Sequence, residues 1–189
     1  MKYIIICISF FLTPAIISAQ NKPRSVFNSY NAVGLTVGES AHSIIVETVN
    51  GLKKGRWFAG AGLAFDAYSY KTVPVYLDLK YFFGDKKQFF VRGDIGYGFI
   101  KKATYQQDKF FDTVKYKGGI YLQSGIGYLL TPAKKHSFYF SVNCGLKKLS
   151  KNAGYIIPDD FPPYNETYVA MDKYDYNFKT ISIKAGYKF

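Results

Sequence analysis

The last ten residues of the chain, 180–189, alternate between two kinds of side chain without a break. Polar residues and glycine occupy the even positions, and apolar or aromatic residues occupy the odd ones, Ile181, Ile183, Ala185, Tyr187 and Phe189. Since successive side chains of a strand point to opposite faces, this stretch predicts a strand with one apolar and one polar face. We therefore expect the rest of the chain to supply further strands of the same kind.

Short alternating runs separated by turn residues do recur along the chain, and we predict eight strands in all. Their ranges are 32–38, 43–50, 57–67, 71–83, 88–100, 118–130, 136–148 and 176–189. Pro74 is unusual inside a strand, but it lies near the start of the fourth one, close to an expected rim. Aromatic residues make up 19% of the chain, and glycine is frequent, which is typical of an all-β protein.

The connections between these strands follow a second pattern. The second, fourth and sixth are short, and each contains a lysine pair, Lys53-Lys54, Lys86-Lys87 or Lys134-Lys135. The fifth and seventh, 101–117 and 149–175, are long. Short periplasmic turns and longer outer loops are the pattern of barrels that cross the outer membrane. We predict an all-β fold, an eight-stranded antiparallel up-and-down transmembrane β-barrel with short periplasmic turns and two long outer loops.

Alternation alone fits a soluble barrel with an apolar interior as well as a membrane barrel with a polar interior. Glycine is frequent on the polar face, which suits a crowded lumen better than a solvated surface. Aromatic residues gather at the strand ends, as in the interfacial girdles of membrane barrels. The polar face also carries mid-strand charges of both signs, which can pair across a lumen. These candidate lumen charges are Glu47, Asp78, Lys80, Arg92, Asp94 and Lys184.

The first 19 residues have the parts of a secretory signal peptide. Lys2 is the charged start, 3–12 is an apolar run, and 17–19 is a small-residue cleavage site. The apolar run is shorter than the roughly 20 residues that a spanning helix needs. We predict a signal peptide at 1–19 that is cleaved, a periplasmic lead-in at 20–31 and an outer-membrane β-barrel at 32–189.

The charge of the chain bears on its partners. Cleavage removes Lys2 from 25 basic and 13 acidic residues, which leaves 24 basic and 13 acidic residues and a net charge of +11. Export argues against nucleic acid, and anionic lipid phosphates match the positive charge better. The periplasmic lysine pairs, with Lys101-Lys102 and Lys147-Lys148 at the outer rim, are expected beside outer-membrane lipids and lipopolysaccharide. Solubilising turns explain these lysines equally well. Cys144, the one cysteine left after cleavage, is expected to be a small apolar side chain in mid-strand.

With these features the chain resembles the small outer-membrane β-barrels of the OmpA/OmpX-like superfamily, the "porin family" of Bacteroidota. The eight strands, the glycine-rich polar face and the terminal Gly186-Tyr187-Lys188-Phe189 carry the resemblance, which covers 32–189. It implies an integral, multi-strand protein of the outer membrane of a Gram-negative bacterium. It also implies that the barrel-assembly machinery reads the terminal strand during biogenesis, with Tyr187 and Phe189 as the signal. Cell-wall anchoring, which in OmpA depends on a second domain, is not carried over.

We expect a structural or interaction role for this chain, because the fold hosts many functions and the long loops offer a binding surface. The partner is a ligand outside the cell, or a larger outer-membrane protein complex that has the chain as an accessory subunit. Aromatic side chains of the long loops are the groups that commonly hold a protein partner. The candidates are Tyr105, Phe110, Phe111, Tyr116, Tyr155, Tyr164, Tyr168 and Tyr174.

Two other functions remain open. A lipid-A-modifying enzyme of the deacylase or acyltransferase type needs a serine activated by histidine, and the available pairs are His42-Ser43 and His136-Ser137. Neighbouring residues of a strand face opposite ways, so neither pair is well placed, and we predict no catalytic residue. Eight strands enclose an interior that side chains just fill, so a wide pore is not expected. A small or gated channel remains an alternative.

No cofactor or metal site is predicted. The acidic residues of the last long loop lack the spacing of a calcium loop and are interpreted as solvated. Asp112-Thr113-Val114 resembles the O-glycosylation sequon of Bacteroidota, which makes Thr113 a candidate for glycosylation.

Overall fold

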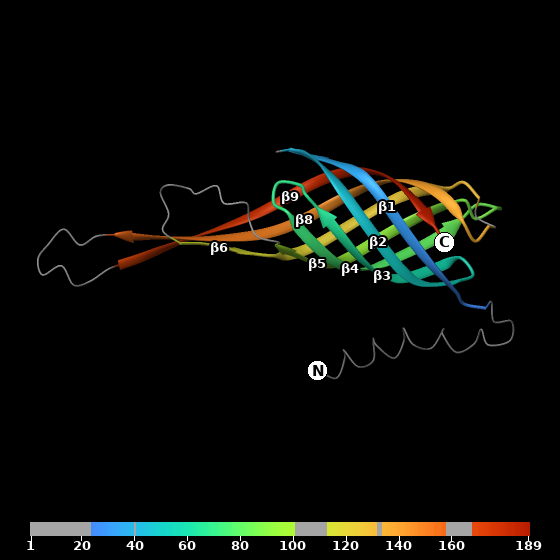
Figure 1. Ribbon diagram of the computed structural model, residues 1–189, viewed down its shortest axis with the longest axis horizontal. Coiled ribbons are helices and arrows are strands. Elements are labelled where there is room, and N and C mark those ends of the chain that lie inside the picture. The colour runs from blue at the N-terminus through green and yellow to red at the C-terminus, as the bar shows by residue number, and fades with distance from the viewer. Residues whose placement is uncertain (1–23, 40, 101–112, 132–133, 158–167) are drawn as a thin grey trace, which may run out of the picture.

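The computed structural model describes residues 24–39, 41–100, 113–131, 134–157 and 168–189 (Figure 1). These residues form nine strands, all paired antiparallel, and the predicted signal peptide at 1–19 lies outside them. The strands are β1 (Val26–Gly38), β2 (His42–Lys54), β3 (Trp57–Asp66), β4 (Thr72–Phe83), β5 (Phe89–Ile100), β6 (Thr113–Lys117), β7 (Gly119–Leu129), β8 (Ser137–Ile157) and β9 (Tyr168–Lys188).

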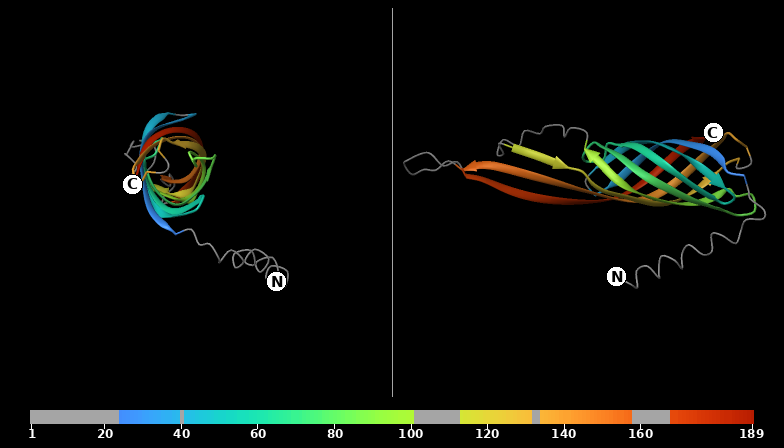
Figure 2. Two further views of the ribbon diagram at one scale, coloured as in Figure 1. Left: turned by 90° about the vertical axis from the view of Figure 1, so that its right-hand side faces the viewer. Right: turned by 90° about the horizontal axis from the view of Figure 1, so that it is seen from below.

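Eight of these strands close into a barrel. They follow one another in the order β8-β7-β5-β4-β3-β2-β1-β9, and β8 also pairs with β9, which completes the ring seen end on in Figure 2. The last strand pairs with the first from Gly38 opposite Thr180 to Tyr30 opposite Lys188. The predicted eight-stranded antiparallel barrel, closed by its C-terminal strand, is confirmed.

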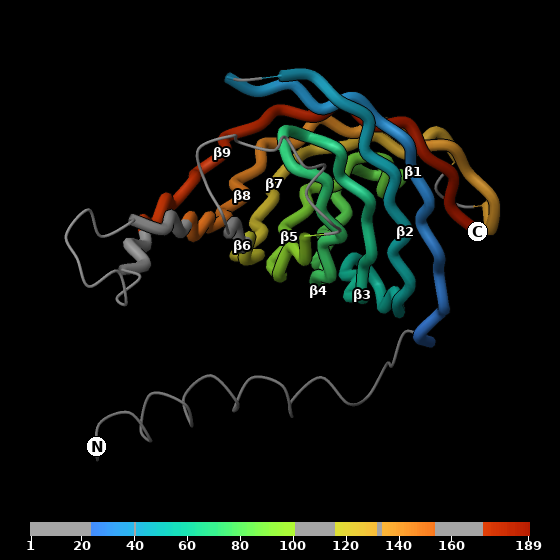
Figure 3. The backbone as a smooth tube through the Cα atoms, turned by 60° about the vertical axis from the view of Figure 1, so that its left-hand side comes forward, coloured from blue at the N-terminus to red at the C-terminus, as the bar shows by residue number. Residues whose placement is uncertain are grey.

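The long connections predicted as loops contain strand residues, 113–117 in the first and 149–157 and 168–175 in the second, and for these residues the prediction is wrong. Beyond Lys147 and Thr180, β8 and β9 have no barrel neighbour and continue as a pair to Ile157 opposite Tyr168. Strand β6 pairs with this part of β8, from Thr113 opposite Gly154 to Lys117 opposite Ser150. Figures 2 and 3 show the three strands projecting from one end of the barrel. We call the segments 113–117, 148–157 and 168–179 the outer ribbon.

The barrel wall also begins earlier than the sequence indicates. Strand β1 starts at Val26, so residues 26–31 belong to the wall and pair with β2 instead of forming a lead-in. Polar residues such as Asn28 and Ser29 hide the alternation there. Both side chains are buried, and the backbone N–H of Ser29 donates to the carbonyl of Phe189 over 2.7 Å. The hydrogen bonds of the ladder therefore extend the strand where the hydrophobic pattern fades.

The two faces of the wall are the reverse of those of a soluble barrel. Along β9, the side chain of Ile183 is 63% exposed, whereas that of the next residue, Lys184, is 1% exposed. Valine, leucine, isoleucine and phenylalanine cover the outside of the other strands in the same way, as Leu35, Leu77 and Ile126 do. A closed barrel satisfies its own backbone hydrogen bonds, and an apolar exterior suits lipid. The predicted localisation is confirmed, and the chain is an integral outer-membrane protein.

No helix in the described ranges is long and apolar enough to cross a membrane.

The two ends of the barrel differ in their connections. The end that carries the short turns β2–β3, β4–β5 and β7–β8 is the periplasmic end, and the outer ribbon lies at the opposite end (Figure 1).

Glycines of the inner face make room for large lumen side chains. A Cβ atom at Gly62 would collide with the ring of Tyr76, and one at Gly186 would collide with the ring of Tyr139. Gly93 faces the other side of the wall, where a Cβ atom would meet nothing within 4 Å. The glycine-rich polar face therefore reflects the crowding of a small lumen, as the sequence indicates.

Candidate functional site

The centre of the lumen holds an ion-pair network around Arg92. Its guanidinium lies 2.6 Å from the Glu47 carboxylate, 2.6 Å from that of Asp94 and 3.0 Å from that of Asp78. All four side chains are buried. Burying so many charges is tolerated only when they are paired closely, and this geometry pairs them across strands β2, β4 and β5.

Two lysines complete the network. The Lys80 ammonium lies 2.6 Å from the Asp78 carboxylate, and the Lys184 ammonium lies 2.5 Å from Glu47 and donates to the Gln123 side-chain carbonyl over 2.7 Å. All six predicted lumen charges therefore face the interior and contact one another. With three acids and three bases, the network has a net formal charge of zero, which limits the cost of its burial.

Aromatic rings fill the lumen on the periplasmic side of this network. Tyr30 packs against Phe58 and Tyr139 with ring centroids 4.9 and 5.6 Å apart, and Phe90 packs against Tyr139 and Phe82 at 6.0 and 5.6 Å. All five side chains are buried. We call these five residues the aromatic plug, because they occupy the space between the ion-pair network and the periplasmic mouth.

Lys147 occupies the outer end of the lumen. Its ammonium lies 2.8 Å from the Asp66 carboxylate and donates to the carbonyls of Tyr68 and Tyr70 over 2.7 and 3.2 Å. The interpretation of Lys147 as a lipopolysaccharide-facing residue is wrong, since its side chain is buried and only Lys148 is exposed. The sequence contains a signal for this contact, because Lys147 shares the inward parity of Asn143 in β8. Side chains thus fill the described lumen from one mouth to the other.

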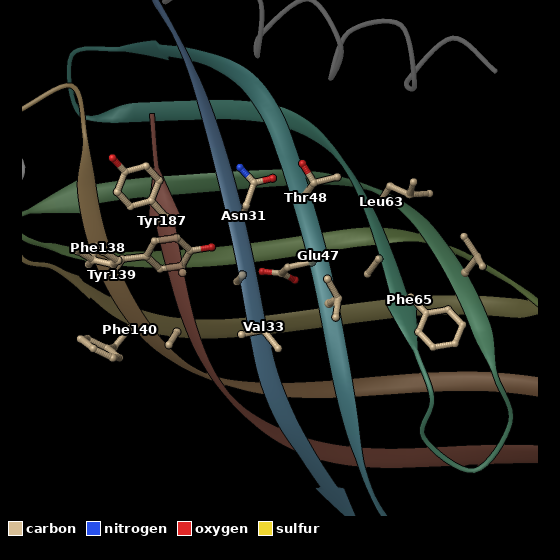
Figure 4. Close-up of a pocket in the computed structure, with 16 residues that line it drawn as sticks. Asn31, Val33, Glu47, Thr48, Leu63, Phe65, Phe138, Tyr139, Phe140 and Tyr187 are labelled. Atoms are coloured by element: carbon tan, nitrogen blue, oxygen red, sulfur yellow. The ribbon is translucent and has the colours of Figure 1, made fainter.

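The wall has hollows on its membrane-facing side. Figure 4 shows one of about 780 Å³ that runs across β8, β9, β1, β2 and β3. Outward side chains such as Val33, Leu63, Phe65 and Phe140 line it. Lipid chains are what such a groove meets, so we do not treat it as a reaction site.

The outer ribbon carries a group of aromatic side chains where it leaves the barrel. The ring of Tyr70 lies 5.3 Å from Tyr116, 5.8 Å from Tyr176 and 6.0 Å from Phe178, and Tyr68 lies 5.8 Å from Phe178. These rings come from the β3–β4 connection, β6 and β9. They connect two strands of the ribbon, β6 and β9, to the outer rim of the barrel.

Polar contacts join the two long strands of the ribbon further along. The Ser150 hydroxyl donates to the Asp175 carboxylate over 2.8 Å, and the Lys173 ammonium lies 3.1 Å from the same carboxylate. The hydrogen bond from Ser150, followed by that from Lys173, lowers the pKa of Asp175. Asp175 is therefore ionised at neutral pH, and the ribbon presents charges of both signs to water.

The structure places the candidate partner-binding residues as follows. Tyr174 is exposed on the ribbon, and Tyr116 is half-buried at its base. The backbones of Tyr155 and Tyr168 lie in β8 and β9, near the far end of the ribbon. Thr113, predicted to lie in a loop, is the first residue of strand β6. Four candidates lie outside the described residues: Tyr105, Phe110, Phe111 and Tyr164.

The histidine–serine pairs lie at opposite ends of the barrel. His42 is exposed at the outer start of β2, next to Ser43. His136 stacks on Tyr187 with ring centroids 5.9 Å apart, and the Ser137 hydroxyl accepts from the backbone N–H of Thr131 over 2.9 Å. In the described ranges, no group of three or more histidine, cysteine or acidic residues is arranged to hold a metal ion.

The two residues of the predicted assembly signal lie on the outer surface at the periplasmic end. The Tyr187 ring packs against Phe138 at 5.1 Å, and Phe189 is 44% exposed. The backbone of Phe189 exchanges hydrogen bonds with that of Ser29 over 2.7 and 3.0 Å. The terminal aromatic residue is thus part of the seam between β9 and β1.

Comparisons with known proteins find similarity to solved structures only. No protein-family model matches it, and no curated protein matches it significantly. The crystal structure of the outer membrane protein OprG from Pseudomonas aeruginosa is similar with 14% identity and a TM-score of 0.45, covering 89% of this chain and 97% of that one. The solid-state NMR structure of the outer membrane protein AlkL in lipid bilayers is similar with 14% identity and a TM-score of 0.45, covering 91% of this chain and 93% of that one.

Proposed function

We propose that this protein is an interaction protein of the cell surface, in which the barrel is a membrane anchor and the outer ribbon binds a protein partner. The observation that carries the proposal is the continuation of β8 and β9 beyond the barrel wall to Ile157 and Tyr168. A barrel needs no such extension to close. Ordered strands outside the membrane give a partner a defined surface to bind.

The ribbon has the chemistry of a binding surface. Strand β1 ends at Gly38, opposite Thr180, so one side of β9 from 168 to 179 has no neighbouring strand in the described residues. Such an edge offers backbone N–H and C=O groups to a strand of another protein. Exposed Tyr174 and the charges of Lys173 and Asp175 lie on the same segment. Tyrosine and charged groups of both signs support specific, polar-rimmed contacts.

The filled lumen supports an anchor over a pore. The aromatic plug, the network around Arg92 and the contact between Lys147 and Asp66 occupy successive levels of the interior. A solute would have to displace buried ion pairs at two of these levels, which costs several kcal/mol for each pair. The alternative of a small or gated channel would need these side chains to move.

Site-specific cross-linking tests the proposal. A photoreactive amino acid at position 174 is expected to cross-link a partner protein in intact cells, whereas the same residue at position 81, on the barrel wall, is not. Replacing 150–175, which includes Lys173, Tyr174 and Asp175, by a short turn between the paired residues Leu149 and Tyr176 should abolish recovery of that partner while the barrel still folds. A matched control replaces Lys134 and Lys135 by Asn-Gly, which alters a hairpin connection at the periplasmic end and leaves the ribbon intact. If the variant that lacks the ribbon still recovered the partner protein, the proposal would be overturned.

A lipid-A-modifying enzyme remains the alternative of a different class, and we propose that the chain is not one. His136 is engaged with Tyr187, and the Ser137 hydroxyl bonds to Thr131, so this pair does not form a serine–histidine contact. Mass spectrometry of lipid A from cells with and without the protein tests this directly. A change in acyl chain number that disappears with His42→Ala or His136→Ala would establish the enzyme.

A further inference from the structure

The periplasmic end of the barrel has a cleft that is unlike the interior in its charge. The cleft has a volume of about 420 Å³ and lies between the β2–β3 and β4–β5 turns. Four of the residues that line it are cationic, Arg24, Lys53, Lys86 and Lys87, and one is anionic, Asp85. The cleft therefore carries an excess of positive charge in a confined space.

These cations lack the partners that the lumen lysines have. Lys80, Lys147 and Lys184 each lie within 2.8 Å of a carboxylate oxygen. Among the residues that the structure describes, by contrast, no carboxylate forms an ion pair with any of the four cations of the cleft. The ammonium of half-buried Lys53 instead lies 3.8 Å from the centre of the Phe82 ring.

The surroundings strengthen the field of these charges. Phe82 belongs to the aromatic plug, so one side of the Lys53 ammonium faces an apolar ring. Low-dielectric walls beside charges of one sign raise the local potential and attract counter-ions. An anion in the cleft would relieve the repulsion between these neighbouring cations.

One of the cations of the cleft, Lys87, has a strained backbone. Lys87 has a φ of 54°, in the left-handed region that favours glycine or asparagine. Its backbone N–H donates to the Gly84 carbonyl over 3.1 Å, which fixes the turn. A residue with a side chain in a strained turn position suggests that the side chain serves a purpose there. Glycine would fit this backbone without the charge.

We propose that the cleft is a binding site for a phosphate-bearing anion, with Lys53 and Lys87 as its principal donors and Arg24 and Lys86 at its rim. Lysine ammonium groups are common partners of phosphate oxygens, which accept several hydrogen bonds at once. The phosphate belongs to an anionic phospholipid of the inner leaflet or to a soluble phosphate of the periplasm, because the cleft is at the end of the barrel where both are within reach.

Native mass spectrometry of the full barrel in phosphatidylcholine nanodiscs with added phosphatidylglycerol tests the site. The variant K53Q/K87Q is expected to bind phosphatidylglycerol about 25-fold more weakly, because each lysine near an anionic group contributes about 1 kcal/mol, a roughly fivefold change in Kd. The matched control K134Q/K135Q removes the same charge from another turn of the same rim and should change Kd less than twofold. K53R/K87R keeps the charge and should retain binding.

A second arm distinguishes the two sources of the phosphate. Inorganic phosphate is titrated calorimetrically into the barrel in pure phosphatidylcholine nanodiscs. Binding of phosphatidylglycerol alone, lost in K53Q/K87Q, assigns the cleft to lipid, and binding of inorganic phosphate, lost in the same variant, assigns it to a soluble phosphate. The proposal would be overturned if K53Q/K87Q and K134Q/K135Q lost the same amount of affinity for the phosphate-bearing probe. It would also be overturned if K53Q/K87Q, with its fold verified by gel mobility, lost no affinity.

Discussion

Arg92 and Glu47 meet across the lumen, with guanidinium and carboxylate atoms 2.6 Å apart, although their strands, β5 and β2, are separated by β3 and β4. The same guanidinium contacts Asp78 and Asp94. One side chain therefore compensates three buried carboxylates from three strands. This relationship makes Arg92 the residue on which the polar interior depends most.

Replacing Arg92 by methionine should lower the free energy of unfolding by about 3–5 kcal/mol, because buried carboxylates lose their main counter-charge. Urea unfolding followed by the fluorescence of Trp57, the single tryptophan, measures the change. Lys173→Met breaks the exposed ion pair with Asp175 and should cost less than about 1 kcal/mol. Similar losses in the two variants would show that the central network does not stabilise the barrel.

Adding one methyl group to the inner face should destabilise the barrel, and adding one to the outer face should not. Gly186→Ala places a Cβ atom against the ring of Tyr139 and should cost about 1–3 kcal/mol by overpacking. Gly93→Ala meets open space and should be neutral or add about 0.4–1 kcal/mol by restricting the unfolded chain. In a Tyr139→Val background, which is itself destabilised by the cavity it leaves, the additional cost of Gly186→Ala should be smaller than in the unsubstituted protein. Equal effects at the two glycines would contradict the assignment of the faces.

In planar bilayers, the purified protein should give no steady current of porin size, since side chains fill the lumen. Lys147→Ala removes the contact with Asp66 at the outer mouth, but the Arg92 network and the aromatic plug remain in series with it. We therefore expect this variant to stay closed as well. A large stable conductance from the unsubstituted protein would refute the closed lumen, and one from Lys147→Ala alone would identify the outer mouth as the barrier.

Thiol labelling should report the membrane face directly. Cys144 is exposed on the outside of β8, so a membrane-permeant pyrene maleimide should modify it in liposomes while a charged maleimide should not. Asp175→Cys in a Cys144→Ala background places the thiol on the outer ribbon, where the charged reagent should react. Rapid reaction of Cys144 with the charged reagent in liposomes would mean that this part of the wall faces water.

The alternation of apolar and polar residues predicts much of the barrel, because neighbouring side chains differ most in their exposure along the strands of the wall. Lys184 lies between Ile183 and Ala185, and this contrast alone places the lysine inside and its neighbours outside. The lumen charges could be chosen on the same basis. Their partners could not, because the contact between Arg92 and Glu47 depends on how the barrel curves, which local sequence does not encode.

The outer ribbon is the part of the fold that the sequence pattern does not predict. Residues such as Ser150 and Asn152 are typical of turns, and strands that face water on both sides need no alternation of apolar and polar residues. Pairing between β8 and β9, supported by β6, decides the structure there instead. The start of β1 is missed for a related reason, since Asn28 and Ser29 are buried polar residues in a segment without an apolar stripe.

Strand β9 runs without interruption from the ribbon through the wall to the seam with β1, so events outside the cell and the closure of the barrel share one stretch of backbone. After assembly, a pull on the ribbon acts along the strand that seals the cylinder. The hydrogen bonds between β9 and β1 therefore resist any force that is applied to the ribbon along β9.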